Sequence, residues 1–106
     1  MITVFVQFQL PQKITREKAA ELFEASAERY RTVDGLVRKY YLHDPDNDRA
    51  GGCYLFHSRA EADAAFDGEW LEMVTEKYGG APDIRYFETP VIVDNDKAAI
   101  QLGSAA

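Results

Sequence analysis

The central stretch of the chain, residues 36–56, reads LVRKYYLHDPDNDRAGGCYLF and predicts a β-hairpin. Its two ends, Leu36–His43 and Ala50–Phe56, are rich in aromatic and branched side chains, which favour strands. Residues 44–49 between them contain a proline, an asparagine and three aspartates, which are typical turn formers. We therefore expect two antiparallel strands joined by a loop of moderate length.

The segment before this hairpin predicts a strand followed by a helix. Residues 2–10 place apolar side chains at every second position, and Pro11 then removes a ladder donor. From Thr15 to about Thr32, apolar or small residues recur at helical spacing while Glu, Lys and Arg occupy the other face. We expect this helix to stop at Asp34-Gly35.

The segment after the hairpin predicts a helix in two pieces and a fourth strand. Ser58 and Glu61 match the capping box, in which a hydroxyl is followed three residues later by a carboxylate. Gly68 interrupts this helix, and a second piece extends to Tyr78. Residues 83–89 suit a strand, which residues 91–93 could extend beyond a proline.

The order strand, helix, strand, strand, helix, strand is the ferredoxin-like βαββαβ motif of α+β proteins. It predicts a four-stranded antiparallel sheet with both helices on one face. Both faces of the predicted strands carry large apolar side chains, so the bare face needs a second layer, which a second copy would supply in a homodimer. Residues 1–93 would form this single domain, and the Ala-rich residues 94–106 a C-terminal tail, either a short helix or a swapped arm.

The composition narrows the possible partners. The chain has 106 residues, with 12 Lys and Arg against 18 Asp and Glu, and its net charge of −6 repels phosphate backbones and anionic lipid headgroups. It has neither a secretion signal at its start nor an apolar run of the ~18 residues that a membrane helix needs. The single cysteine excludes an internal disulfide. We expect a soluble, cytoplasmic protein that binds neither nucleic acid nor membrane.

The hairpin register predicts how side chains divide between the two faces. If the hairpin closes symmetrically about residues 46–48, Tyr41 pairs with Tyr54 and Arg38 with His57. One face then carries mainly aliphatic side chains with three polar ones among them, and we expect it to lie under the helices around a small pocket. The other is aromatic and suits contact with a partner subunit. The first face holds Leu36, Arg38, Tyr40, Leu42, Cys53, Leu55 and His57, and the second holds Val37, Lys39, Tyr41, His43, Tyr54 and Phe56.

Three residues of the first face are candidates for catalysis. His57, where a strand meets a helix cap, would act as general base at the pocket mouth, or else bond to nearby backbone. Arg38 would face a cavity or a partner, because an isolated buried guanidinium is very costly, or else reach the surface. Tyr40 would donate to an oxyanion, or else serve as a core aromatic.

Three further residues are candidates for binding a substrate. Trp70, after the helix break, would form a flat wall for a ring-shaped ligand, or else fill the core. Leu55 and Cys53 share the face of the predicted pocket, and Cys53 suits a small buried hydrophobe.

No metal site is expected. His43 and His57 would lie on opposite faces and roughly 17 Å apart along the strands at ~3.3 Å per residue, too far to share an ion. Asp44, Asp46 and Asp48 have the first spacings of a calcium loop, but Arg49 and Leu55 stand where that loop needs its Gly and closing Glu, and we interpret them as a solvated turn. Gly51-Gly52 would permit a bulge or a close backbone approach.

The run Ala50–Phe56, AGGCYLF, followed by a helix start, resembles the YdhR-like monooxygenases of the dimeric α+β barrel superfamily. The resemblance extends back through residues 34–39, DGLVRK, and with the strand order covers roughly residues 2–93. It implies a dimer in which two sheets pack face to face into a barrel. The related antibiotic-biosynthesis monooxygenases oxidise polycyclic phenols without flavin, haem or metal, in a pocket between sheet and helices. They tend to carry Asn and Trp near positions where this chain has Cys53 and His57.

The resulting hypothesis is a homodimeric, cofactor-independent monooxygenase of a small aromatic phenol or quinol. His57 would deprotonate the phenol, Arg38 and Tyr40 would hold the phenolate, and Trp70 would stack on the ring. The alternatives are a non-catalytic barrel that binds a small hydrophobic metabolite, and a non-oxidative isomerase or cyclase on the same fold.

Overall fold

The computed structural model describes residues 1–97 and 99–103, and its order of elements follows the predicted one. The second helix is divided in two, as the sequence predicts, and two further short strands follow the fourth strand. The elements are β1 (Ile2–Gln9), α1 (Arg16–Tyr30), β2 (Leu36–Asp44), β3 (Arg49–Phe56), α2 (Arg59–Ala65), α3 (Gly68–Tyr78), β4 (Asp83–Glu88), β5 (Val91–Asp94) and β6 (Ala99–Leu102).

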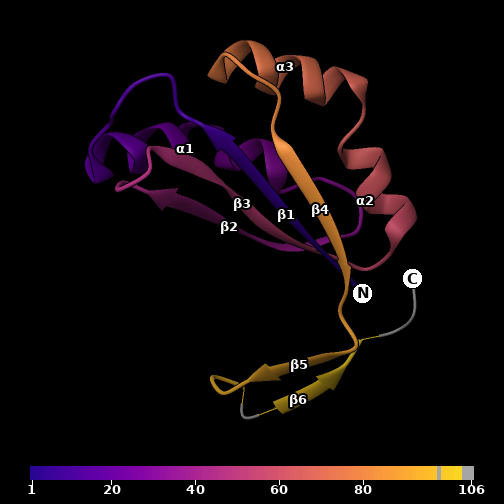
Figure 1. Ribbon diagram of the computed structural model, residues 1–106. Coiled ribbons are helices and arrows are strands. Elements are labelled where there is room, and N and C mark those ends of the chain that lie inside the picture. Colours follow the sequence, from indigo (N-terminus) through magenta and orange to yellow (C-terminus); the bar gives the residue numbers. More distant parts are fainter. Residues whose placement is uncertain (98, 104–106) are drawn as a thin grey trace.

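The main sheet has four antiparallel strands in the order β2-β3-β1-β4. The three helices cover one of its faces (Figure 1). This arrangement confirms the predicted ferredoxin-like α+β fold. No helix in the described part of the chain has the length and apolarity needed to cross a membrane.

Local side-chain caps fix where the helices begin. Thr15 and Ser58 accept hydrogen bonds from the backbone N–H groups of Lys18 and Glu61, at 3.1 and 3.2 Å. The break between the two helical pieces, expected at Gly68, lies one residue earlier, at Asp67. The side chain of Asp67 caps α3 by accepting a hydrogen bond from the backbone N–H of Trp70 at 2.8 Å. This cap starts a new helix and aims the indole of Trp70 at the sheet.

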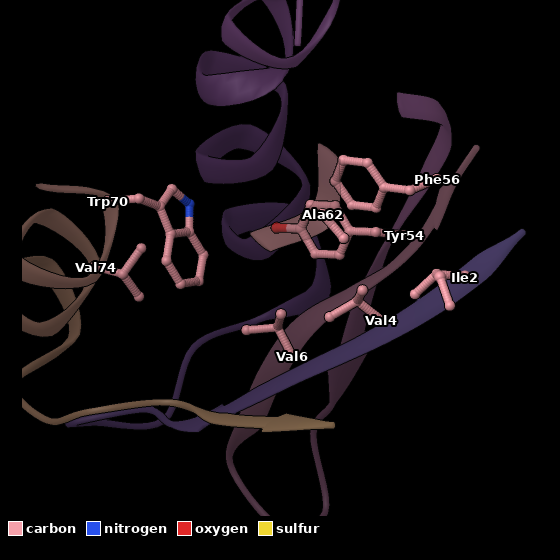
Figure 2. Close-up of a cluster of buried hydrophobic side chains, with 8 residues drawn as sticks. All are labelled: Ile2, Val4, Val6, Tyr54, Phe56, Ala62, Trp70 and Val74. Atoms are coloured by element: carbon pink, nitrogen blue, oxygen red, sulfur yellow. The ribbon is translucent and has the colours of Figure 1, made fainter. Parts of the chain in front are cut away.

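The core lies between the helices and one face of β1 and β3 (Figure 2). Figure 2 shows the side chains of α3 meeting those of the two strands. Gly51 lets these strands approach, because a Cβ at this position would overlap the carbonyl oxygen of Val6; the predicted close backbone approach is therefore confirmed. The buried cluster consists of Ile2, Val4, Val6, Tyr54, Phe56, Ala62, Trp70 and Val74.

The hairpin register differs from the predicted one by two residues. Tyr41 pairs with Gly52 and Arg38 with Leu55, and a bulge lies between Leu36 and Arg38. The predicted pairing was wrong because β2 continues to Asp44 and the hairpin closes one residue earlier than symmetric closure requires. A shift of two residues preserves strand alternation, so most residues keep the predicted division between faces.

The helices cover the opposite face from the one we expected. Tyr54 and Phe56, on the aromatic face, are buried under the helices, whereas Tyr40, on the aliphatic face, is 56% exposed. The expectation that the helices cover the aliphatic face was therefore wrong. The physical reason is that aromatic rings offer the largest apolar area, and the chain buries that area against its own helices.

The two last strands form a separate hairpin. β5 and β6 pair with each other and project from the end of β4, away from α3 (Figure 1). This hairpin includes residues 91–93, which the sequence places in the main domain, and it lies where the sequence allows a short helix in the tail. Residues 98 and 104–106 of that tail lie outside the described part. Asp94 links the hairpin to the main sheet through an ion pair with Arg38 at 3.9 Å.

Candidate functional site

A cavity of about 70 Å³ lies between the helices and the sheet. An adjoining cavity of about 180 Å³ shares four of its lining residues, among them Trp70 and Tyr54. The walls of the smaller cavity come from α1, α3 and the first three strands, so distant parts of the sequence assemble it. Its polar lining consists of Ser26, Arg29, Tyr30, Lys39, Tyr41, Tyr54, Lys77 and Tyr78.

Lys39 lies among tyrosine rings in this cavity. Its position in β2 directs the side chain toward the helices, and its Nζ lies 3.5 Å from the ring centroid of Tyr30 and 3.8 Å from that of Tyr41. A third ring, that of Tyr54, lies 4.7 Å away. The faces of the three rings carry partial negative charge, so they are favourable neighbours of an ammonium group.

The environment nevertheless lowers the pKa of Lys39 from 10.5 to about 7. Burial is the main cause, because it penalises the charged form, and the positive charges of Lys77 and Arg29 act in the same direction. A substantial fraction of the molecules therefore carries a neutral amine at neutral pH. A neutral amine in a cavity can accept a proton from a bound molecule.

The tyrosine hydroxyls form a hydrogen-bonding wall around this amine. The Tyr30 hydroxyl accepts from the indole Nε1–H of Trp70 at 3.1 Å, and the hydroxyls of Tyr41 and Ser26 lie 2.8 Å apart. Burial raises the pKa of Tyr41 and also that of Tyr54. These two hydroxyls therefore remain protonated and can donate hydrogen bonds to a ligand.

The structure places one of the six predicted site residues in the cavity. Trp70 is 5% exposed and lines both cavities, where it acts as an aromatic wall and as part of the core. His57 is exposed at the end of β3 and does not line either cavity.

The remaining predicted residues lie on the far side of the sheet from Trp70. Arg38 is half-buried and pairs with Asp94, and Tyr40 is largely exposed. Cys53 and Leu55 alternate with the buried Tyr54 and so point to the same bare face. The structure therefore does not assemble these residues with Trp70 into one site.

Sequence reasoning missed the central residue of the cavity, Lys39. It assigned Lys39 and Tyr41 to the partner-facing side because their face is aromatic. A lysine within a run of tyrosines on an otherwise apolar strand face was the available signal. Among the described residues, no three His, Cys, Asp or Glu side chains gather in a way that could hold a metal ion.

Comparisons with known proteins agree with this architecture. The chain is similar to a crystal structure of a monooxygenase from the gene ActVA-Orf6 of Streptomyces coelicolor in complex with nanaomycin D. The TM-score is 0.62 at 18% identity, over 83% of this chain and 86% of the other, which indicates a shared fold. No curated protein matches the chain. The family model described as "Putative mono-oxygenase ydhR" matches residues 3–87. The chain therefore belongs to the ydhR mono-oxygenase family, as the resemblance in its central hairpin indicated.

Proposed function

We propose that the protein is a monooxygenase that oxidises a small, electron-rich phenol or quinol without flavin, haem or metal. The substrate would bind in the cavity between the sheet and the helices, with Lys39 as the proton acceptor. One observation carries this proposal, namely the amine of Lys39 enclosed by three tyrosine rings at the cavity wall. The family and the shared fold support the general class of reaction.

The proton transfer is energetically feasible at this position. A phenol has an ordinary pKa of about 10, so transfer to an amine with a pKa of about 7 costs about 4 kcal/mol. The ammonium and phenolate that form attract each other by about 4 kcal/mol at ~4 Å in a partly buried site. The two contributions are comparable, and the hydroxyls of Tyr41 and Tyr54 further stabilise the phenolate.

Dioxygen then supplies the oxygen atom that enters the product. The phenolate ring transfers an electron to dioxygen, and the resulting radicals combine into a peroxide anion on a ring carbon. The ammonium of Lys39 then returns its proton to this anion and gives the hydroperoxide. Loss of water breaks the O–O bond and the C–H bond at that carbon and leaves a carbonyl group. One oxygen atom remains in the product, the other leaves as water, and the substrate supplies all the electrons that dioxygen accepts.

The size of the site supports a reaction without an organic cofactor. Pockets for drug-sized ligands usually enclose ~300–1,000 Å³. The two cavities here measure about 70 and 180 Å³, which suits a single small ring better than a flavin beside its substrate.

The bare face of the sheet supports the dimer that the family resemblance implies. Phe87 is 53% exposed and Tyr40 56% exposed, and they lie on the same face as Phe5 and Leu55. A second copy would cover this apolar face, and the hairpin of β5 and β6 would add further apolar area. Arg38, Tyr40, Cys53 and Leu55 would then be interface residues.

The test uses hydroquinone with isotopically labelled dioxygen. Oxygenation gives hydroxyquinone with one labelled oxygen atom, whereas simple autoxidation gives quinone and hydrogen peroxide. Lys39→Met, which keeps an unbranched side chain among the rings, should abolish labelled product. Lys18→Met, on the exposed surface of α1, should behave as wild type.

Each result bears on a different part of the proposal. Labelled hydroxyquinone from Lys39→Met at the wild-type rate would exclude Lys39 as the base. Hydroquinone that binds wild-type protein without any product would favour the non-catalytic binding protein. Turnover that persists without dioxygen would favour an isomerase or cyclase.

A further inference from the structure

The cavity has an unusual charge for this chain. Arg29 from α1, Lys39 from β2 and Lys77 from α3 all line the smaller cavity, and no described Asp or Glu does. Asp67 and Glu69 line only the adjoining cavity, which Arg29 shares. The chain as a whole carries 18 acidic against 12 basic residues, so three cations around one cavity run against its overall composition. Such a concentration of like charge creates a local positive potential.

The three cations also have no carboxylate partner in the described part of the chain. The ion pairs among the described residues involve other lysines and arginines, whereas these three contact neutral groups. Arg29 contacts the sulfur of Met73, Lys77 lies 5.5 Å from the ring of Tyr78, and Lys39 lies among tyrosines. No ion pair in the described part of the chain therefore offsets their mutual repulsion, and an anionic ligand would relieve it.

The positions of the three cations distinguish the mouth of the cavity from its interior. Arg29 and Lys77 occur in the last turns of α1 and α3 and are exposed, so they lie at the mouth of the cavity. Lys39 is half-buried among aromatic rings. Attraction to the helix C-termini accounts for the first two positions, but it does not account for a lysine in the middle of a strand.

We propose that the cavity selects an aromatic acid, whose carboxylate binds Arg29 and Lys77 at the mouth while its hydroxyl-bearing ring points toward Lys39. The inference rests on the proposed function, since it names the substrate class of the same site. A planar ring would lie against the aromatic walls that Trp70 and the tyrosines provide, and its anionic group would supply the missing counter-charge.

Binding of the acid should depend on pH through Lys39. An anion at the mouth favours the ammonium form of Lys39, so binding takes up a proton and weakens as the pH rises through neutrality. The fraction of Lys39 that stays neutral in the complex is the one that accepts the proton of the phenol. Burial raises the pKa values of Tyr41, Tyr54 and Tyr78, so these groups stay neutral in that range. The charged or titratable groups that face Lys39 are Arg29 and Tyr30 from α1, Tyr41 from β2, Tyr54 from β3, and Lys77 and Tyr78 from α3.

The experiment compares two probes of nearly identical shape, 4-hydroxybenzoate and its neutral amide 4-hydroxybenzamide, by calorimetry without dioxygen. In both probes the hydroxyl lies at the opposite end of the ring from the carboxylate or amide, as the proposed orientation requires. We expect 4-hydroxybenzoate to bind at least about tenfold more tightly, because charge-assisted hydrogen bonds are stronger than neutral ones. This preference should disappear in the double variant Arg29→Gln/Lys77→Gln. The matched control, Arg16→Gln/Lys18→Gln, removes the same charge from the other end of α1 and should keep the preference.

Two results would overturn the inference. One is equal affinity of the wild-type protein for the two probes. The other is an equal loss of preference in the control variant, which would indicate only a general effect of net charge. Oxygenation of hydroquinone without a preference for 4-hydroxybenzoate over its amide would leave the proposed function standing and this inference refuted. A preference for 4-hydroxybenzoate without oxygenation of any phenol would support the inference and refute the proposed function.

Discussion

The replacement Lys39→Met should change how the stability of the protein depends on pH. The pKa of Lys39 lies at about 7 in the folded protein and near 10.5 in an unfolded chain. Between these values the unfolded chain binds more protons than the folded one, so the free energy of unfolding rises with pH. The cost of burying the ammonium is therefore fully present below neutral pH and disappears toward pH ~10.5.

The size of this effect follows from the surroundings of Lys39. A pKa lowered from 10.5 to about 7 corresponds to roughly 5 kcal/mol, at ~1.4 kcal/mol per unit. Lys39 is only half-buried, which lowers this cost, and the contact of its ammonium group with the tyrosine faces offsets a further ~0.5–2 kcal/mol of it. We therefore expect a destabilisation of about 3 kcal/mol below neutral pH, of which about 2 kcal/mol is recovered by pH ~10.

The assay is urea denaturation of wild type and Lys39→Met at a series of pH values. The variant lacks the titrating amine, so the difference in unfolding free energy between the two proteins isolates the contribution of Lys39. The variant should be more stable at about pH 6, with an advantage that shrinks by about 2 kcal/mol toward pH ~10. The matched variant Lys18→Met should show a constant difference from wild type. An advantage of Lys39→Met that does not vary with pH would refute the reasoning.

Three further predictions address the site, the fold and the assembly. His57→Ala should leave the oxygenation of hydroquinone unchanged, because His57 lies outside the cavity; loss of labelled product would instead restore His57 as the base. Gly51→Ala should lower the melting temperature or prevent folding, since its Cβ would overlap β1, whereas Gly80→Ala has open space around it and should melt like wild type. Native mass spectrometry should give a wild-type dimer near twice 12.0 kDa and a monomer for Tyr40→Asp. A monomeric wild type would contradict the proposed covering of the bare face.

Much of the local structure could be predicted because its causes are local. Side-chain alternation predicted the strands, and Thr15 and Ser58 are found at the helix starts because a hydroxyl there satisfies a free backbone N–H. The division of Lys39 and Arg38 between opposite faces follows from the period of a strand, and it survived a shift in the hairpin register.

The candidate site could be predicted only in part. Trp70 was expected to form an aromatic wall, and it does line the cavity. Lys39 was visible in the sequence, but its role depends on Tyr30 from α1 and Tyr54 from β3, which approach it only in the folded chain. Its lowered pKa has the same origin, because burial and the charges of Arg29 and Lys77 arise from packing.

The sequence by itself determined the order of the elements as far as β4, the cap of α2 at Ser58 and the two sets of side chains on the central hairpin. The tertiary structure decided which set the helices cover, and hence which residues line the cavity. The alternation of side chains along a strand indicates that the two faces of the sheet differ, but it does not indicate which face is buried. Burial depends on how β1 pairs with β3 and on where the helices pack. Tyr54 and Phe56 pair with the buried side of β1, and this long-range register placed Lys39 inside and Arg38 outside.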